Sequence, residues 1–290
     1  MKTILLFFLL ACCNAVHAQE DELRPSLGVM FGMINYEGDL KPNSFTYHKS
    51  RPLGAVTLRL PLSRWFVWRS GALAGSVQAA DRDNREYLKQ RNLSFRSSIY
   101  ELHTGIETVF FNLEQAGWTP YLFLGGAVFR FNPWTFDEQG KKVYLQPLGT
   151  EGQGLDAYPG RLPYRRTQVA VLWAGGFRVR AGEHVRIGLE FSQRKTFTDY
   201  LDDVSSSYAD YNKLLEARGQ QAVDLAYRGD EINGAPYPAA GEQRGTPTEK
   251  DWYYYLGITL EADLHSIRDF VRRKMNRGND WYNQRCPDRF

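Results

Sequence analysis

Three carboxylates, Asp199, Asp202 and Asp203, lie close together in one polar stretch of the sequence. Carboxylate oxygens are the ligands that hard cations such as Ca²⁺ take, so the cluster could bind a metal. The regular spacing of a calcium-binding loop is absent, however. Aspartate also stabilises turns, because its side chain accepts hydrogen bonds from nearby backbone N–H groups. We favour turn formation here, and we expect neither a metal nor a cofactor.

A histidine with carboxylates at even spacing could perform acid–base chemistry. His103 shares one face of an alternating segment with Glu101 and Glu107. Such a trio suits general acid–base catalysis in a hydrolase. An ion network in the interior of a β-barrel explains the same pattern more simply. No serine has the context of a nucleophile elbow, and no phosphate loop is present. We therefore expect no catalytic residue here.

The N-terminus predicts export. A charged start and a short apolar run, 4–13, precede small residues that end at Ala18, as in a secretory signal peptide covering residues 1–18. An alternative is lipidation at Cys12, which we disfavour because this cysteine lies very early in the apolar run. Removal of residues 1–18 would leave a single cysteine, Cys286, out of three. A lone cysteine in an oxidising compartment indicates a free thiol or an intermolecular disulfide, and we favour the disulfide.

The element that organises the chain is the segment 185–194, in which apolar and polar residues alternate. Val185, Ile187, Leu189 and Phe191 share one face, and charged side chains occupy the other. Similar segments cover 26–36, 52–62, 65–80, 95–111, 121–131, 166–180 and 251–264. With the segment 185–194 they make about eight strands. Two strands are harder to orient: 121–131 is apolar on both faces, and 65–80 carries Arg69 on an otherwise apolar face.

Two architectures fit such strands. A soluble sandwich would bury the apolar faces in a core, whereas a membrane barrel would turn them to lipid and enclose the charges. The aromatic content of 14% suits interfacial girdles, and the connections alternate between long and short. The net charge of only +3 argues against nucleic acid as a partner. A soluble sandwich or lipocalin-like barrel needs neither the girdles nor the alternation.

We therefore predict an all-β protein. Residues 19–264 should form an eight-stranded antiparallel transmembrane barrel of about the smallest size in the outer membrane, with long outer loops and a lumen filled by side chains. Opposite charges in that lumen can neutralise one another. The side chains expected to point inward are Arg59, Glu101, Glu107, Arg178, Arg186, Glu190, Arg194 and Glu261.

The final segment, 265–290, changes character. Apolar residues at helical spacing alternate with cations that include Arg268, Arg272 and Arg273. The even number of strands places this tail on the periplasmic side. It could dock a partner, lie on the membrane surface or remain a solvated helix, and the pattern alone leaves these alternatives open.

Several stretches resemble one family. They are LQPLGTEGQG at 145–154, RKTFTDYLDDVS at 194–205, YEGDL at 36–40, RG at 244–245 before DWY at 251–253, and CP at 286–287 before the final Phe290. In these stretches the chain resembles the PorG-like outer-membrane barrels of the type IX secretion system, including its gliding-type paralogues.

The resemblance implies a non-enzymatic outer-membrane component that anchors the ring lipoprotein complex of a secretion machine from the periplasm. Cys286 would be a covalent link to that lipoprotein, and Arg268, Arg272 and Arg273 would belong to the docking segment. The two long motifs would pack over the barrel mouth on the outer side, where Gly149, Gly152 and Gly154 permit close backbone approach. The motif residues assigned to the candidate site are Pro147, Gly149, Glu151, Gly152, Gly154, Thr198, Asp199, Tyr200, Asp202 and Asp203. The rival functions are an outer-membrane enzyme, such as a lipid A deacylase or an omptin-like protease, and a small surface-binding or adhesion barrel.

Overall fold

The computed structural model describes residues 24–41, 49–269 and 272 of the 290-residue chain. The expected signal peptide, 1–18, lies outside the described residues, and so do Arg273 and Cys286.

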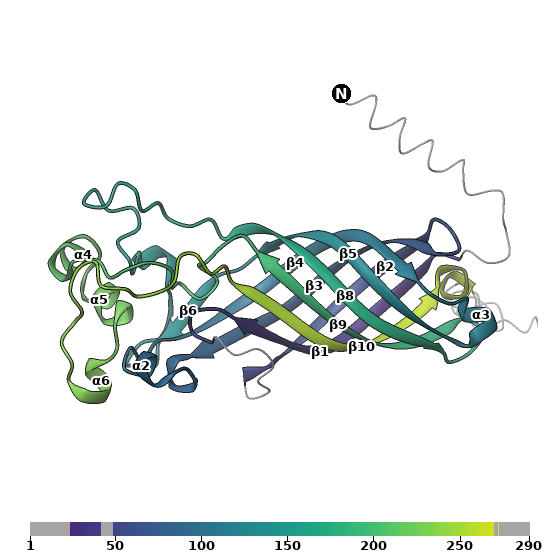
Figure 1. Ribbon diagram of the computed structural model, residues 1–290, viewed down its shortest axis with the longest axis horizontal. Coiled ribbons are helices and arrows are strands. Elements are labelled where there is room, and N and C mark those ends of the chain that lie inside the picture. Colours follow the sequence, from purple (N-terminus) through teal and green to yellow (C-terminus); the bar gives the residue numbers. More distant parts are fainter. Residues whose placement is uncertain (1–23, 42–48, 270–271, 273–290) are drawn as a thin grey trace, which may run out of the picture.

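The strands form one closed antiparallel barrel (Figure 1). The sheet contains ten strands, of which β6 (Pro133–Phe136) and β7 (Lys142–Tyr144) only extend β4, so eight strands make the wall. Neighbours pair in the order β3-β2-β1-β10-β9-β8-β5-β4, and pairing of β3 with β4 closes the ring. The wall strands are β1 (Ser26–Glu37), β2 (Arg51–Pro61), β3 (Phe66–Ala80), β4 (Ser94–Val109), β5 (Trp118–Arg130), β8 (Thr167–Arg180), β9 (Val185–Thr196) and β10 (Trp252–Asp263). The expected fold class is confirmed.

The connections differ greatly between the two ends of the barrel. Short ones, 62–65, 110–117 and 181–184, lie at the end that also holds the start of β1 and the end of β10 (Figure 1). The middle one contains α3 (Leu113–Ala116). The long connections lie at the opposite end, and their helices are η2 (Asp81–Asp83), α2 (Glu86–Lys89), η3 (Gln146–Leu148), α4 (Tyr211–Arg218), α5 (Gln220–Ala226) and α6 (Asp230–Asn233). None of the helices in the described ranges is long and apolar enough to cross a bilayer.

The outer surface of the barrel is apolar. Phe31 is 72% exposed, Leu102 68% and Ile258 61%, although all three are large hydrophobic side chains. Aromatic residues gather near the short-turn end, among them Trp65, Phe66, Trp68, Phe110, Phe111 and Trp118. A water-soluble protein rarely exposes such a surface, whereas a lipid-facing band flanked by aromatic girdles has this composition.

The interior is charged through the middle of the barrel. Arg69 donates two hydrogen bonds to Glu190, at 2.6 and 2.8 Å, and Arg194 donates two to Glu101, at 3.0 and 2.9 Å. These side chains are buried, and burial of charge is tolerated only where partners neutralise it. The residues predicted to point inward do so, with Arg186 half-buried at the short-turn end beside Asp263.

Register settles the two strands that the sequence left ambiguous. Arg69 on β3 pairs with Gly105 on β4, so it shares the inward face with Glu107. Phe123 on β5 pairs with Glu107 in turn, which turns Phe123 inward and Leu124 outward. A strand that is apolar on both faces thus takes its orientation from its neighbours.

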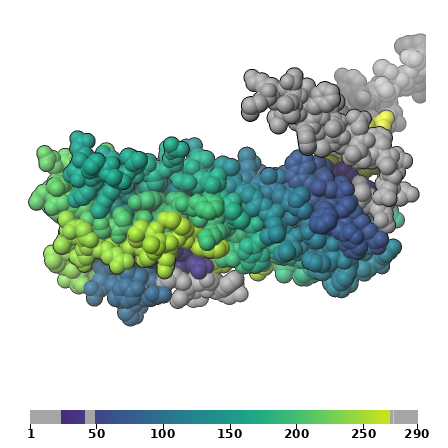
Figure 2. Space-filling model, turned by 45° about the horizontal axis from the view of Figure 1, so that its top comes forward, coloured from purple at the N-terminus to yellow at the C-terminus, as the bar shows by residue number. Residues whose placement is uncertain are grey.

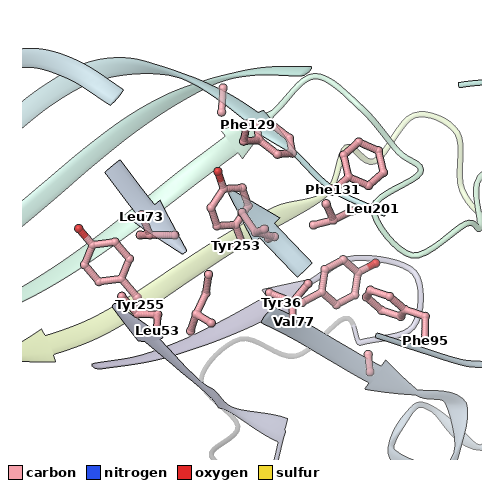
Figure 3. Close-up of a cluster of buried hydrophobic side chains, with 14 of the residues drawn as sticks. Tyr36, Leu53, Leu73, Val77, Phe95, Phe129, Phe131, Leu201, Tyr253 and Tyr255 are labelled. Carbon is pink, nitrogen blue, oxygen red and sulfur yellow. The ribbon is translucent and has the colours of Figure 1, made fainter. Parts of the chain in front are cut away.

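An aromatic cluster fills the interior toward the loop end. Tyr36, Phe95, Phe129 and Tyr253 come from the wall strands, and Leu201 enters from the connection between β9 and β10 (Figure 3). The rings of Tyr36 and Phe95 meet edge to face at 5.0 Å between centroids. A loop residue thereby becomes part of the barrel core, and it ties the long connections to the wall.

Candidate functional site: a cap on the barrel mouth

The long connections form a folded cap, which we define as residues 145–164 and 197–251. The stretches that carry the family resemblance within the described residues all meet there, although they are far apart in sequence. The cap lies beyond the loop end of the strands, with α4, α5 and α6 on its outer part (Figures 1 and 2).

Glu151 is the hub between the two long motifs. One of its carboxylate oxygens accepts hydrogen bonds from the backbone of Ser205 at 2.9 Å and from Arg244 at 3.0 Å, and the other accepts from the hydroxyl of Ser206 at 2.7 Å. Tyr200 adds a longer contact at 3.3 Å. Glu151 is fully buried, so these donors take the place of water around its charge.

Asp203 forms a second tie. Its two oxygens accept from the hydroxyls of Thr150 and Tyr164, each at 2.6 Å. Its own backbone oxygen accepts from Arg244 at 2.6 Å. The residue adopts a positive φ of 70°, a conformation that aspartate tolerates better than most residues. Burial raises the pKa of Asp203 to about 6, against the opposing effect of the Arg244 guanidinium.

Tyr36 links the barrel wall to the cap through two carboxylates. Its hydroxyl lies 2.6 Å from Asp202 and 2.9 Å from Asp251. One hydroxyl proton cannot satisfy two carboxylates at once, and all three groups are buried. Burial raises the pKa values of both aspartates well above the usual range, with added repulsion from Asp39 at Asp202 and from Asp202 at Asp251. The hydroxyl of Tyr36 thus lies between two buried carboxylates whose protonated forms burial favours.

Asp199 and Asp39 complete the acidic group. Asp199 accepts from the hydroxyl of Ser205 at 2.7 Å, while its other oxygen is buried without a hydrogen-bond partner among the described residues. Burial raises the pKa of Asp199 to about 7. Asp39 accepts from the backbone of Thr246 at 3.0 Å, and burial raises its pKa as well.

Glycines shape the first motif. Gly149 and Gly152 have φ of 58° and 81°, which lie in the left-handed region that favours glycine. A side-chain carbon at Gly149 would lie 2.7 Å from the carbonyl oxygen of Gln153, and one at Gly152 would lie 2.6 Å from the ring of Tyr158. Gly154 also has a positive φ, of 72°. The motif closes on itself only because these positions lack side chains.

The remaining motif residues support the same packing. Pro147 lies in η3, and the hydroxyl of Thr198 accepts from the backbone of Tyr200 at 3.2 Å. The ring of Tyr200 stacks on Tyr164 at 4.7 Å between centroids. Farther out, α4 and α5 enclose a small apolar core made of Leu155, Ala209, Leu214, Ala222, Val223 and Ala226.

The polar side chains of this site hold the loops of the cap to one another. Most cap carboxylates accept hydrogen bonds from backbone, hydroxyl or guanidinium donors, and Asp202 closes a tight turn by accepting from the backbone of Val204 at 2.9 Å. Within the part of the chain that the structure describes, no group of three or more His, Cys, Asp or Glu could hold a metal ion. The hydrogen bond from Val204 to Asp202 fits the turn-forming interpretation of the acidic cluster.

His103 lies on β4 in the barrel interior. Its Nδ1 is 2.8 Å from Glu101, which also binds Arg194, and its Nε2 is buried without a hydrogen-bond partner among the described residues. Glu107 instead contacts Arg59, Arg69 and Arg178. The trio read from the sequence thus divides between two ion clusters.

Two of the three arginines assigned to the docking segment, Arg268 and Arg272, are described. The strand β10 ends at Asp263, and residues 264–269 and 272 are helical. Arg268 and Arg272 are exposed on this helix, at the short-turn end of the barrel. They do not meet the cap, which occupies the opposite end (Figure 1).

Sequence reasoning missed Arg244 and Asp251 as members of the site. Both are fully or nearly buried, and both fasten the motifs to each other or to the wall. Loops have no periodicity that distinguishes a buried polar residue from an exposed one. The only signal was their place in the shared motifs.

A closed antiparallel barrel with an apolar outer belt, aromatic girdles and a charged, side-chain-filled interior defines a β-barrel of the outer-membrane class. The chain belongs to the DUF6089 family, described as a domain of unknown function, whose model matches residues 1–147. That description contains no activity.

Solved structures of other barrels show likeness at low identity. Neisserial surface protein A is 6% identical, with 83% of this chain and 97% of that chain covered and a TM-score of 0.41. OprG from Pseudomonas aeruginosa is 10% identical, with coverage of 83% and 97% and a TM-score of 0.42. Ail of Yersinia pestis is 8% identical in its complex with a heparin analogue, with coverage of 83% and 99% and a TM-score of 0.38. No match was found among curated proteins. At these scores we transfer no function from them.

Proposed function

We propose that this protein is a non-enzymatic outer-membrane component of a protein secretion machine of the type IX kind. Its long loops face outward, and its tail anchors the periplasmic ring lipoprotein complex to the membrane. The motif resemblance to PorG-like barrels supports this function, and the observation that carries it is the position of the tail. The chain passes from the last wall strand into a helix with exposed Arg268 and Arg272, at the end opposite the cap.

The architecture suits an anchor. The barrel interior is occupied by buried ion pairs and aromatic rings, as expected for about eight strands. Such a barrel holds position in the membrane without offering a route for a folded substrate. The helix at the short-turn end then supplies cations to a partner, and Cys286 supplies a thiol for a disulfide with the lipoprotein.

The first test is a non-reducing gel of outer membranes, with mass spectrometry of any band that collapses on reduction. We expect a complex that contains a ring lipoprotein in the wild type and its loss in Cys286→Ser. Cys13→Ser is the matched control, because Cys13 lies in the expected signal peptide and would be removed with it. An unchanged complex in Cys286→Ser would remove the covalent link.

The second test addresses the cations. Arg268→Glu combined with Arg272→Glu should reduce co-purification of the ring lipoprotein and secretion of its cargo. Arg165→Glu changes an exposed arginine at the cap end and should affect neither. Equal effects from the two charge reversals would contradict docking through the tail.

A second candidate is a small surface-binding barrel, and the folded cap is the observation that favours it. A cap with its own apolar core and α4 and α5 on its outside presents a rigid outer face. Replacement of residues 211–233 by a short Gly-Ser linker distinguishes the two functions. Loss of cell-surface ligand binding with secretion intact would support the surface-binding barrel. Loss of cargo secretion would support a role for the cap in the machine.

A further inference from the structure

An unusual group of cations lies on the outside of the barrel near the cap. Lys142 lies 4.4 Å from the ring centroid of Trp134 and 4.7 Å from that of Tyr144. The guanidinium of Arg96 lies 5.5 Å from the ring centroid of Trp134. Lys142, Trp134, Tyr144 and Arg130 line a small notch with a volume of about 200 Å³, and Arg96 borders it through Trp134. We call this group, with Tyr100 and Ser98, the basic notch.

Strand register places the basic notch on the outer face. Arg130 on β5 pairs with Tyr100 on β4, and Trp134 on β6 pairs with Arg96 on β4 and with Tyr144 on β7. Tyr100 and Arg130 are exposed, with apolar side chains below them on the same face of each strand. The outer face of the wall therefore changes from apolar to polar at the level of Tyr100. Aromatic residues are enriched at such a membrane interface.

The cations of the basic notch lack anionic partners. In residues 24–41, 49–269 and 272, no ion pair joins Arg96, Arg130 or Lys142 to a carboxylate, although the wall contains many such pairs in its interior. Aromatic rings hold two of the cations in place instead. Cations fixed beside rings and left without a counter-charge are ready to bind an anion.

An apolar groove continues from the notch down the lipid-facing wall. Its volume is about 770 Å³, and Tyr100 and Arg130 line both the groove and the notch. Small residues on neighbouring strands form its floor, since Gly54 pairs with Ala74. Larger side chains rise beside it, among them Phe31, Val56, Leu102 and Val128.

We propose that the groove and the basic notch together bind a phosphorylated glycolipid of the outer leaflet, of the lipid A type. Its acyl chains occupy the apolar groove, and its phosphates bind Arg130, Lys142 and Arg96. Arginine and lysine bind phosphate strongly, and basic sites at membrane depth select anionic headgroups. A zwitterionic headgroup carries a single phosphate, which cannot neutralise three cations. A lipid with more than one phosphate therefore complements them better.

The inference rests on the orientation in the proposed function, with the cap outside. It does not depend on the secretion machine, because the lipid would bind whether or not the tail docks a partner. Failure of the tail experiments therefore leaves this inference intact, and failure of the lipid experiment leaves the anchor intact.

The experiment is native mass spectrometry of the purified full chain in detergent micelles, with bisphosphorylated lipid A, dephosphorylated lipid A or phosphatidylethanolamine added. We expect retention of the bisphosphorylated lipid alone. Arg130→Gln and Lys142→Gln should each weaken that retention by about fivefold. Ala74→Leu narrows the groove on the exposed face and should weaken it without changing the charge.

Lys195→Gln is the matched control. Lys195 also lies over an aromatic ring at the loop end, 5.2 Å from the centroid of Trp252, but it lines neither the groove nor the notch. Heat-modified migration on gels verifies that each variant still forms a barrel. Equal retention of dephosphorylated lipid A or of phosphatidylethanolamine would overturn the proposal. Equal loss in Lys195→Gln, or no retention by the wild type, would overturn it as well.

Discussion

The carboxylate of Glu151 lies 3.0 Å from the guanidinium of Arg244, although 93 residues separate the two in sequence. Both side chains are buried, and Arg244 also binds backbone oxygens of Asp203 and Ala226. Arg91 donates to the backbone oxygen of Arg244 and thereby joins the connection between β3 and β4 to the same point. A single ion pair therefore couples several connections of the cap.

Removal of one partner of this pair should loosen the cap. In Arg244→Gln, Glu151 keeps a buried charge without its cation, and such a loss costs about 3–5 kcal/mol. We expect faster proteolysis and faster amide exchange over residues 145–164 and 197–251, with the barrel still folded. Hydrogen-exchange mass spectrometry in detergent micelles measures both regions at once.

The exposed ion pair Lys89–Glu86 provides the control, with its atoms 2.6 Å apart on α2. Exposed pairs contribute about 0–1 kcal/mol, so Lys89→Gln should leave cap exchange nearly unchanged. The double variant Glu151→Gln, Arg244→Gln should recover part of the loss, because no unpaired charge remains. Equal exchange in Arg244→Gln and the wild type would show that the pair does not hold the cap.

Cap stability should fall as pH rises. Burial raises the pKa of Asp199 to about 7 and that of Asp203 to about 6 in the folded cap, against about 3.9 for an exposed aspartate. Between pH of about 4 and 7 the folded cap binds more protons than the opened cap, so opening becomes easier with increasing pH. Limited proteolysis at pH 5 and pH 8 should show greater protection at the lower value.

Asp199→Asn tests the cause of this dependence. The amide cannot ionise, so the pH dependence of protection should become shallower, with protection at pH 8 raised toward that at pH 5. Asp224 lies on α5 and is exposed, and Asp224→Asn should keep the wild-type slope. An unchanged slope in Asp199→Asn would assign the dependence to other groups.

The interior ion pairs should contribute strongly to barrel stability. Arg69→Met would leave Glu190 buried with only the hydroxyls of Tyr121 and Tyr255 as donors, at 2.7 and 2.6 Å. We expect a loss of about 3–5 kcal/mol in the free energy of unfolding, measured by urea titration in lipid vesicles. Arg69→Met combined with Glu190→Gln should recover part of it, whereas a neutral single variant would contradict the network.

A charged side chain placed in the apolar belt should lower the free energy of unfolding in lipid. Leu124 is 58% exposed on the outer face of β5, and Leu124→Arg should cost about 2–4 kcal/mol in a bilayer. Leu162 is 76% exposed but lies in the cap, so Leu162→Arg should change the unfolding free energy by less than about 0.5 kcal/mol. Equal costs in vesicles would show that lipid does not cover Leu124.

The wall strands could be predicted from sequence because alternation has a fixed period. The pattern around Ile187 and Leu189 identifies an outward face, and both residues are exposed as expected. The orientation of β5 could not be read, since apolar residues on both of its faces conceal the period. Register with Glu107 on β4 supplies it, and register is a property of the pair of strands.

The contacts within the cap could not be predicted from the sequence. The motifs indicated where it lies, but Asp203 binds Thr150 and Tyr164 through contacts that no spacing encodes. Buried polar networks depend on three-dimensional proximity across long loops. The basic notch was also missed, because Arg96 and Lys142 become neighbours only when β6 pairs with β4 and β7.

The interior ion pairs join strands made early in the chain to strands made late. Arg69 on β3 meets Glu190 on β9, and Glu101 on β4 meets Arg194 on β9. Until β9 is in place, Glu101 lacks its arginine, and Arg69 has Glu107 as its only carboxylate partner among the described residues. Hydrocarbon does not accept unpaired charge. An incomplete sheet should therefore be costly to place in the bilayer, and we expect the chain to insert only once the late strands supply these partners. The network would then couple insertion into the membrane to closure of the barrel, in addition to stabilising the closed form.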